Sequence, residues 1–296
     1  MVQRTLPLFT HSQGGHRRVM AESLALAWRA MTKWLRNPFS VMAALLQAIF
    51  WLALFGNSFN PANALSSSAL GGGSLGVLQQ AFGGAANYIT FLTPGVIGIV
   101  SLTTMSFMGV DVVFDRMNGY LDTLRTYPIP RTSIYFGAAL QNVAKAMATA
   151  VITFVLALIV PNGLRLIGGF GILDLLGVFL VFALLAAVFS GLFTGIAITV
   201  KSTDSFFGAV NLLTFPIMFT STALFPITFF PSWMKPFAQA NPVSLASGAA
   251  RLLIVDGTLT STQVAAFAGE IAGLALYGVL FAVLGIIMAQ RALRPR

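Results

Sequence analysis

The 296-residue sequence contains no cysteine, so it can form neither a disulfide nor a metal site with cysteine ligands. For the same reason it carries no information about the redox state of its compartment. Charged residues make up only 8% of the chain, against about 25% in a typical soluble domain, and hydrophobic residues make up 57%. This composition excludes an ordinary soluble protein and indicates an integral membrane protein.

Groups that commonly carry out catalysis are also scarce. The only histidines, His11 and His16, lie near the N-terminus, and no carboxylate pair or metal-ligand spacing falls in the apolar part of the chain. No phosphate-binding G-x-x-x-x-G-K-[ST] loop occurs, because Gly71-Gly72-Gly73 is not followed by lysine. We predict a chain that is not an enzyme and has no catalytic residue, metal site or cofactor of its own.

Six segments with little or no charge are long enough to cross a membrane. As helices rising 1.5 Å per residue, each would cover a hydrocarbon core of about 30 Å. Lipid offers no hydrogen-bond partners, so each lipid-facing segment must pair its own backbone groups, and the alternation typical of strands is absent. The sequence therefore predicts an all-α bundle of six transmembrane helices. Their expected ranges are 38–56, 87–110, 134–160, 175–200, 206–225 and 271–289.

The N-terminal region divides into a tail and an amphipathic stretch. Residues 1–19 are polar and basic without the pattern of a cleaved signal peptide, so we expect a cytoplasmic tail followed by one transmembrane domain over 20–296. Before the first span, apolar and basic residues form two separate stripes at helical spacing, which predicts a helix lying in the membrane interface. A charged anchor that only orients the first span is the alternative. The stripes are Leu24, Trp28, Met31 and Leu35, and Arg29, Lys33 and Arg36.

The basic residues predict the topology. Thirteen of the 17 flank the spans on one side, and the opposite side has only Arg165, Lys235 and Arg251. The positive-inside rule then places both termini in the cytoplasm. A nucleic-acid partner is not expected, because there is no folded soluble domain with a basic face. The thirteen are Arg4, Arg17, Arg18, Arg29, Lys33, Arg36, Arg116, Arg125, Arg131, Lys201, Arg291, Arg294 and Arg296.

The cytoplasmic connection between the second and third spans has a helical pattern. Met117, Leu121 and Leu124 fall on one face, and Pro128 must end any helix that precedes it. We predict a short amphipathic helix over 115–127. By itself, such a pattern is more typical of a solvated helix that only reconnects two spans.

The stretch after the fifth span, 226–256, combines apolar residues with four prolines. Non-helical backbone at membrane depth must be buried in protein or face a cavity, so a pair of short re-entrant helices on the outer side is expected. The alternative is an interfacial loop with Trp233 and Lys235 as headgroup anchors.

Polar residues within the spans are candidates for a transport pathway. Lys145, Asp111 and Glu270 all lie near span ends, so we expect them to reach water and to have structural or interfacial roles rather than proton-transfer roles. Six smaller polar residues could line a cavity, although such groups often bond to their own helix. They are Thr103, Thr104, Ser106, Asn211, Thr214 and Thr220.

Two blocks of residues together resemble the ABC type-2 transporter permeases, most closely the daunorubicin-resistance-type drug and lipid exporters. Met117 stands where such permeases often have an acid, and the Gly/Ser-rich loop at 57–86 is unusual for them. The first block is Tyr88, Phe91, Leu92, Pro94, Gly95, Asp115, Arg116, Gly119, Leu121, Leu124 and Pro128-Ile129-Pro130-Arg131. The second is Phe225-Pro226, Phe230-Pro231, Trp233, Pro236-Phe237-Ala238, Asn241-Pro242-Val243 and Arg251.

The resemblance implies a permease of the cytoplasmic membrane, expected in a prokaryote, that exports an amphipathic lipid, glycolipid or hydrophobic drug. Its partners would be a separate ATPase subunit, which binds ATP and magnesium, and a second copy of the chain or a related permease. Helix 115–127 would be the coupling helix, with Asp115, Arg116, Asn118, Gly119, Leu121, Asp122, Arg125 and Pro128 contacting the ATPase. Pro226, Pro231, Trp233, Asn241, Pro242 and Arg251 would form an outer gate.

One alternative function is an ion-coupled secondary transporter. That class would favour an internal repeat and a carboxylate near the membrane midplane, and the sequence shows neither.

Overall fold

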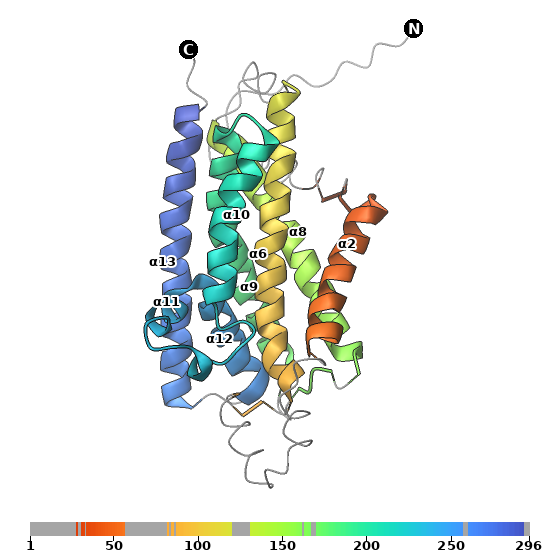
Figure 1. Cartoon of the computed structure of the whole chain (residues 1–296), viewed down its shortest axis with the longest axis vertical. Helices are drawn as coiled ribbons and strands as arrows, with labels where there is room; N and C mark the ends of the chain where they lie inside the picture. The colour runs from red at the N-terminus through yellow and green to blue at the C-terminus, as the bar shows by residue number, and fades with distance from the viewer. Residues whose placement is uncertain are drawn as a thin grey trace, which may run out of the picture.

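The computed structural model describes residues 28, 31–32, 34–56, 82, 84–85, 87–119, 131–161, 163–166, 170–256 and 260–292. Within these ranges the chain is helical and has no strand. Figure 1 shows the long helices side by side along one axis. The prediction of an all-α membrane protein is therefore confirmed for the described part of the chain.

Four helices are long and apolar enough to cross a membrane: α6 (Tyr88–Met117), α8 (Arg131–Ile159), α9 (Ile172–Thr199) and α13 (Ser261–Ala292). Each corresponds to one predicted span. The largest difference is in α13, which begins at Ser261 instead of Ile271. Its early start is explained by the Thr260 N–H, which donates to Gln263 Oε1 at 2.8 Å, a side-chain cap that stabilises the first turn.

Two further predicted spans correspond to shorter elements. The first is α2 (Pro38–Ile49), continued by the wider π-helical turns of η1 (Phe50–Phe55). The other is α10 (Thr203–Thr220), which ends before the predicted Phe225, because Ser221 is extended and its hydroxyl bonds the Met218 carbonyl at 2.7 Å. The count of six crossings stays a prediction.

The long helices are arranged so that chain connections gather at two ends of the bundle (Figure 1). At the first, called the Lys201 end, α6 and α9 finish, α8 and α10 begin and α13 finishes. At the second, called the Asp256 end, α6, α9 and α13 begin and α12 (Pro242–Asp256) finishes. Arg131, Lys201 and Arg291 thus share one end, as the topology prediction requires. Which side of the membrane that end faces remains a prediction.

Close packing holds α9 against α13. A side chain on Gly195 would meet the backbone of Gly285, and one on Gly191 would meet Ala282. Small residues let membrane helices approach closely, which replaces the hydrophobic effect as a source of association in lipid. The Tyr135 hydroxyl of α8 donates to the Gly191 carbonyl at 3.0 Å, so α8, α9 and α13 form a connected unit.

Candidate functional site

A non-helical segment interrupts the bundle between α10 and α12. It begins with residues 221–224, which we call the junction, and continues through a short 3₁₀ turn, η2 (Ile227–Phe229), and a short helix, α11 (Lys235–Ala240). The proline-rich sequence explains why no long helix forms there. Two short helices therefore lie where a re-entrant pair was predicted, and their depth in a membrane stays a prediction.

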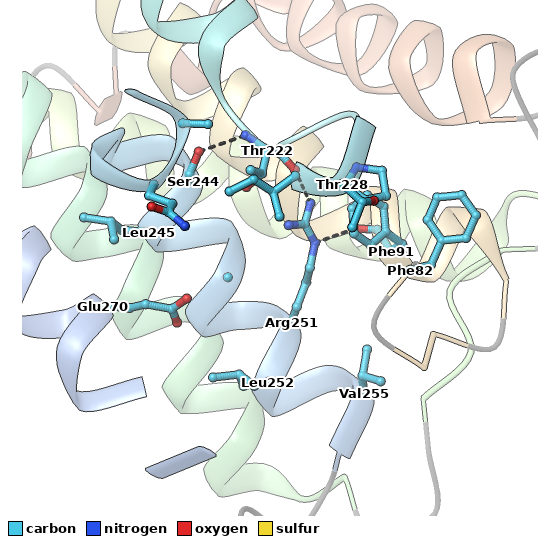
Figure 2. A pocket seen from close by; sticks show the side chains of 15 residues that line it. Phe82, Phe91, Thr222, Thr228, Ser244, Leu245, Arg251, Leu252, Val255 and Glu270 are labelled. Carbon is cyan, nitrogen blue, oxygen red and sulfur yellow. Dashed lines mark hydrogen bonds between the residues drawn. The ribbon is translucent and has the colours of Figure 1, made fainter. Parts of the chain in front are cut away.

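Arg251 of α12 donates to the backbone of the junction. Its Nη2 lies 2.8 Å from the Thr222 carbonyl oxygen and 3.1 Å from that of Ala223, and its Nε lies 3.0 Å from the Phe91 carbonyl oxygen of α6. Figure 2 shows the guanidinium directed at these groups. The Arg251 Cζ also lies 3.9 Å from the centre of the Phe91 ring. One side chain therefore joins α12, α6 and the junction.

Other side chains satisfy the remaining polar backbone of the junction. The Thr222 N–H donates to Ser244 Oγ at 2.8 Å, and the Tyr88 hydroxyl donates to the Leu224 carbonyl at 3.0 Å. Gly95 lies so close that a Cβ there would overlap the Ala223 carbonyl. Non-helical backbone away from water requires such partners, and here α6 and α12 supply them.

Asn241 links the end of α10 to the start of α12. Its Nδ2 donates to the Ile217 carbonyl at 2.6 Å and to Thr220 Oγ1 at 3.0 Å, while its Oδ1 accepts the Val243 N–H at 2.9 Å. Asn241 thus bonds the last turn of α10 and the first turn of α12 at the same time.

A cavity of about 350 Å³, called the Arg251 pocket, lies beside the junction. Figure 2 shows lining residues from α6, α12 and α13 and from the segment after the junction. Of the predicted outer-gate residues, only Pro226 and Arg251 line it. The other four do not: Asn241 and Pro242 are buried, and Pro231 and Trp233 are exposed. The full lining is Phe82, Phe91, Thr222, Pro226, Ile227, Thr228, Ala238, Gln239, Ser244, Leu245, Gly248, Arg251, Leu252, Val255 and Glu270.

A second cavity of about 370 Å³ lies among α2, α6 and α8 and includes Trp34. Of the six predicted pathway residues, only Thr104 lines it, and its hydroxyl is 3.4 Å from that of Thr149. Thr103 is not part of the lining, and its hydroxyl accepts a hydrogen bond from the lining residue Gln47, whose Nε2 lies 2.6 Å away. Trp34, which belongs to neither predicted N-terminal stripe, is 5% exposed, whereas Trp28 and Leu35 are exposed.

The other predicted pathway residues do not gather around one cavity. Ser106 of α6 and Thr214 of α10 are buried with their hydroxyl oxygens 2.9 Å apart, so they connect two helices. The Thr220 hydroxyl bonds the Pro216 carbonyl of its own helix, and Asn211 is exposed on α10. Their visible roles are helix contacts, and their part in a pathway stays a prediction.

The sequence predicts that Lys145 reaches water, but in the structure it does not. It is 2% exposed, and its Nζ lies 2.8 Å from Asp111 Oδ2 on α6, whose side chain is 49% exposed. A buried ammonium needs a partner, and the half-exposed carboxylate of the neighbouring helix provides one. The expectation that Lys145 reaches water was wrong, because its ammonium is buried in an α6–α8 ion pair, whereas Asp111 is half-exposed.

Comparisons with known proteins identify the family of this chain. The ABC-2 type transporter family matches residues 22–255, from before α2 to the end of α12. This chain belongs to the ABC-2 type transporter family. It is 27% identical to ycf38 of Porphyra purpurea, a candidate transport permease, over 94% of this chain and 90% of that protein.

Two relatives have names that refer to drug resistance. The daunorubicin resistance ABC transporter permease protein DrrB1 of Streptomyces coeruleorubidus is 24% identical over 79% of this chain and 75% of its own length. DrrC of Mycobacterium tuberculosis, a candidate doxorubicin resistance ABC transporter permease, is 24% identical over 86% of this chain and 84% of its own length. Relatives of this chain thus occur both in bacteria and in Porphyra, so the prokaryotic origin stays a prediction.

The segment that was predicted to couple to an ATPase differs in one respect from the expectation. Asp115, Arg116 and Met117 form the last turn of α6 and do not begin a separate helix. Gly119 has φ of 73°, which is left-handed, so a single helix over 115–127 is wrong at this position. Glycine commonly ends a helix in this conformation. The predicted contacts Leu121, Asp122, Arg125 and Pro128 lie outside the described residues.

Sequence reasoning missed several residues of the Arg251 pocket. Glu270 was placed at the start of a span, but it lies well inside α13 and faces α12. Nothing in the sequence marks Ser244 and Gly248 as pocket residues, because small residues are common in membrane helices. The one available clue was the pair of charges Arg251 and Glu270 in otherwise apolar helices.

Proposed function

We propose that this ABC-2 permease subunit exports an amphipathic lipid, glycolipid or hydrophobic drug, using ATP hydrolysed on a separate subunit. Its family and the drug-resistance permeases among its relatives support an exporter. The lack of a phosphate-binding loop in the sequence supports a separate ATPase. The proposed complex contains that ATPase and a second copy of the chain or a related permease.

One structural observation carries the proposal: α6 connects the two candidate sites directly. This helix of 30 residues is about 45 Å long, and it runs from Tyr88 beside the junction to Met117 before the coupling segment. At the Asp256 end its Tyr88 hydroxyl and Phe91 carbonyl bond the junction and Arg251. A displacement of the Met117 end would therefore move groups that hold the junction.

Pro94 gives α6 a defined weak point near the junction. Proline lacks the N–H that continues the helical bonding and clashes with the carbonyl of the preceding turn. The Phe91 carbonyl, in that turn, accepts from Arg251. We propose that α6 tilts about this turn when the ATPase moves the coupling segment, and that the junction and pocket then change shape as an outer gate.

The proposed orientation places the Lys201 end in the cytoplasm, where the ATPase binds. The described basic residues Arg131, Lys201 and Arg291 at that end support it. Both termini would then be cytoplasmic, in the cytoplasmic membrane.

The test is transport by the permease reconstituted with its cognate ATPase in liposomes, measured as ATP-dependent movement of a fluorescent phospholipid. Gly119→Pro should reduce transport at least about tenfold, because proline fixes φ near −65° and cannot adopt the turn that ends α6. Arg116→Glu should also reduce transport, by reversing a charge proposed to contact the ATPase.

Gly119→Asn is the matched control, because asparagine tolerates left-handed backbone and a Cβ at this position meets nothing within 4 Å. It should transport at a rate close to wild type. Equal transport by the proline variant, or transport with the ATPase omitted, would contradict the proposal.

A further inference from the structure

Glu270 presents an unpaired oxygen at the Arg251 pocket. Its side chain comes from α13 and lines the pocket wall opposite Arg251 (Figure 2). Among the described residues, Glu270 Oε2 is one of four buried side-chain polar atoms without a hydrogen-bond partner. A buried carboxylate oxygen without a partner is unfavourable, so a ligand that donates to it would gain the full benefit of that bond.

The positive charge nearest to Glu270 is already engaged. Three hydrogen bonds direct the Arg251 guanidinium at the Phe91, Thr222 and Ala223 carbonyls, and its Cζ lies over the Phe91 ring. No ion pair between Arg251 and Glu270 is present in this described region. Arg251 therefore stabilises backbone, and Glu270 is left to interact with a molecule in the pocket.

Gly248 determines the position of the carboxylate. A Cβ on Gly248 would overlap Glu270 Oε1, so the absence of a side chain lets Glu270 approach α12. Thr228 and Gln239 line the pocket and are exposed, which connects it to the surface of the molecule.

The rest of the pocket suits an apolar group. Phe82, Phe91, Leu245, Leu252 and Val255 supply aromatic and aliphatic walls, and about 350 Å³ lies within the usual size range of small-molecule sites. A carboxylate beside apolar walls complements a molecule with one cationic N–H donor and one hydrocarbon part, because a charge-assisted bond is stronger than a neutral one.

We infer that the Arg251 pocket binds amphipathic amines, with the ligand ammonium on Glu270 and its hydrocarbon part against the aromatic and aliphatic walls. The inference rests on the proposed function, since it names a substrate class for the exporter.

The test is calorimetric binding of octylamine to the purified permease in phosphatidylcholine nanodiscs without an ATPase, with empty nanodiscs subtracted. Octylammonium should bind more tightly than octyltrimethylammonium, which has no N–H, and more tightly than octanol or octanoate. Glu270→Gln should weaken octylammonium binding about tenfold or more and leave octanol binding unchanged, because one charge-assisted bond is lost.

Two variants control this experiment. Glu270→Asp keeps the charge but withdraws it by one methylene, so it should weaken binding less than Glu270→Gln. Asp174→Asn removes a carboxylate at the same end of the bundle, where Asp174 Oδ2 accepts the Gly171 N–H outside the pocket, and should leave binding unchanged.

Equal octylammonium affinity in wild type and Glu270→Gln, or equal affinity of wild type for octanoate, would overturn the inference. Either result would leave ATP-driven export intact as a proposal, because binding is measured without the ATPase. Conversely, loss of coupling in the Gly119→Pro variant would not change this binding.

Discussion

Two cations of the described residues, Lys145 and Arg251, lie inside the helical bundle, and they are stabilised in different ways. Lys145 contacts a single carboxylate, Asp111, on a neighbouring regular helix. Arg251 contacts three backbone carbonyls, two of them in the non-helical junction. In a regular helix the backbone carbonyls already accept hydrogen bonds from the same helix, so a buried cation beside it pairs with an acidic side chain. Where a helix is interrupted, some carbonyls lack a backbone donor, and a cation can donate to them.

The comparison also explains the choice of side chain. An ammonium is compact and suits a single carboxylate, while the planar guanidinium presents several N–H groups in fixed directions. Arg251 uses two nitrogens for acceptors on different segments, which lysine could not match from the same position. Three predictions examine this difference.

The largest effect is expected at Arg251. Arg251→Met would leave three carbonyls without their charged donor, so the free energy of unfolding should fall by about 3 kcal/mol or more. Arg251→Lys should recover less than half of that lost stability, because an ammonium lacks the several N–H groups that the guanidinium directs at different carbonyls. The measurement is denaturant titration of the permease in detergent, followed by circular dichroism; similar stability of the lysine variant and wild type would contradict this account.

An intermediate effect is expected for the Asp111–Lys145 pair. Asp111→Asn should lower the free energy of unfolding by about 1–2 kcal/mol, a value reduced from that of a fully buried pair because Asp111 is 49% exposed. Adding Lys145→Met should restore part of the loss, since no unpaired ammonium is then buried. A double variant less stable than Asp111→Asn in the same titration would show that the two side chains act independently.

The smallest effect is expected at Ser244. Ser244→Ala removes the acceptor of the Thr222 N–H and should cost about 1 kcal/mol. Thr153→Val is the matched control, because the buried Thr153 hydroxyl donates only to the Thr149 carbonyl of its own helix. Thr153→Val should lower the free energy of unfolding by less than Ser244→Ala does. If the two variants lose the same stability, the junction depends on its side-chain hydrogen bonds no more than a regular helix does.

The sequence predicted the fold where a local property determines it. Runs with little or no charge located α6, α8, α9 and α13, and the prolines after Phe225 located the interruption of the bundle. Boundaries were less accurate because they depend on individual caps, such as Gln263 at the start of α13.

The candidate site was less predictable because its contacts join distant parts of the chain. Arg251 and Phe91 are 160 positions apart, and the acceptor is a backbone carbonyl that every residue possesses. Lys145 and Asp111 are 34 positions apart on different helices. Gly119 was placed inside a helix because the sequence does not distinguish a glycine within a helix from one that ends it.

The Asn241 link has a consequence for how length varies in this region. One amide group fastens α10 to α12, so the chain leaves the bundle after Thr220 and returns at Asn241 next to its point of departure. Residues between the junction and α11 can therefore be added or removed without changing how the two flanking helices align.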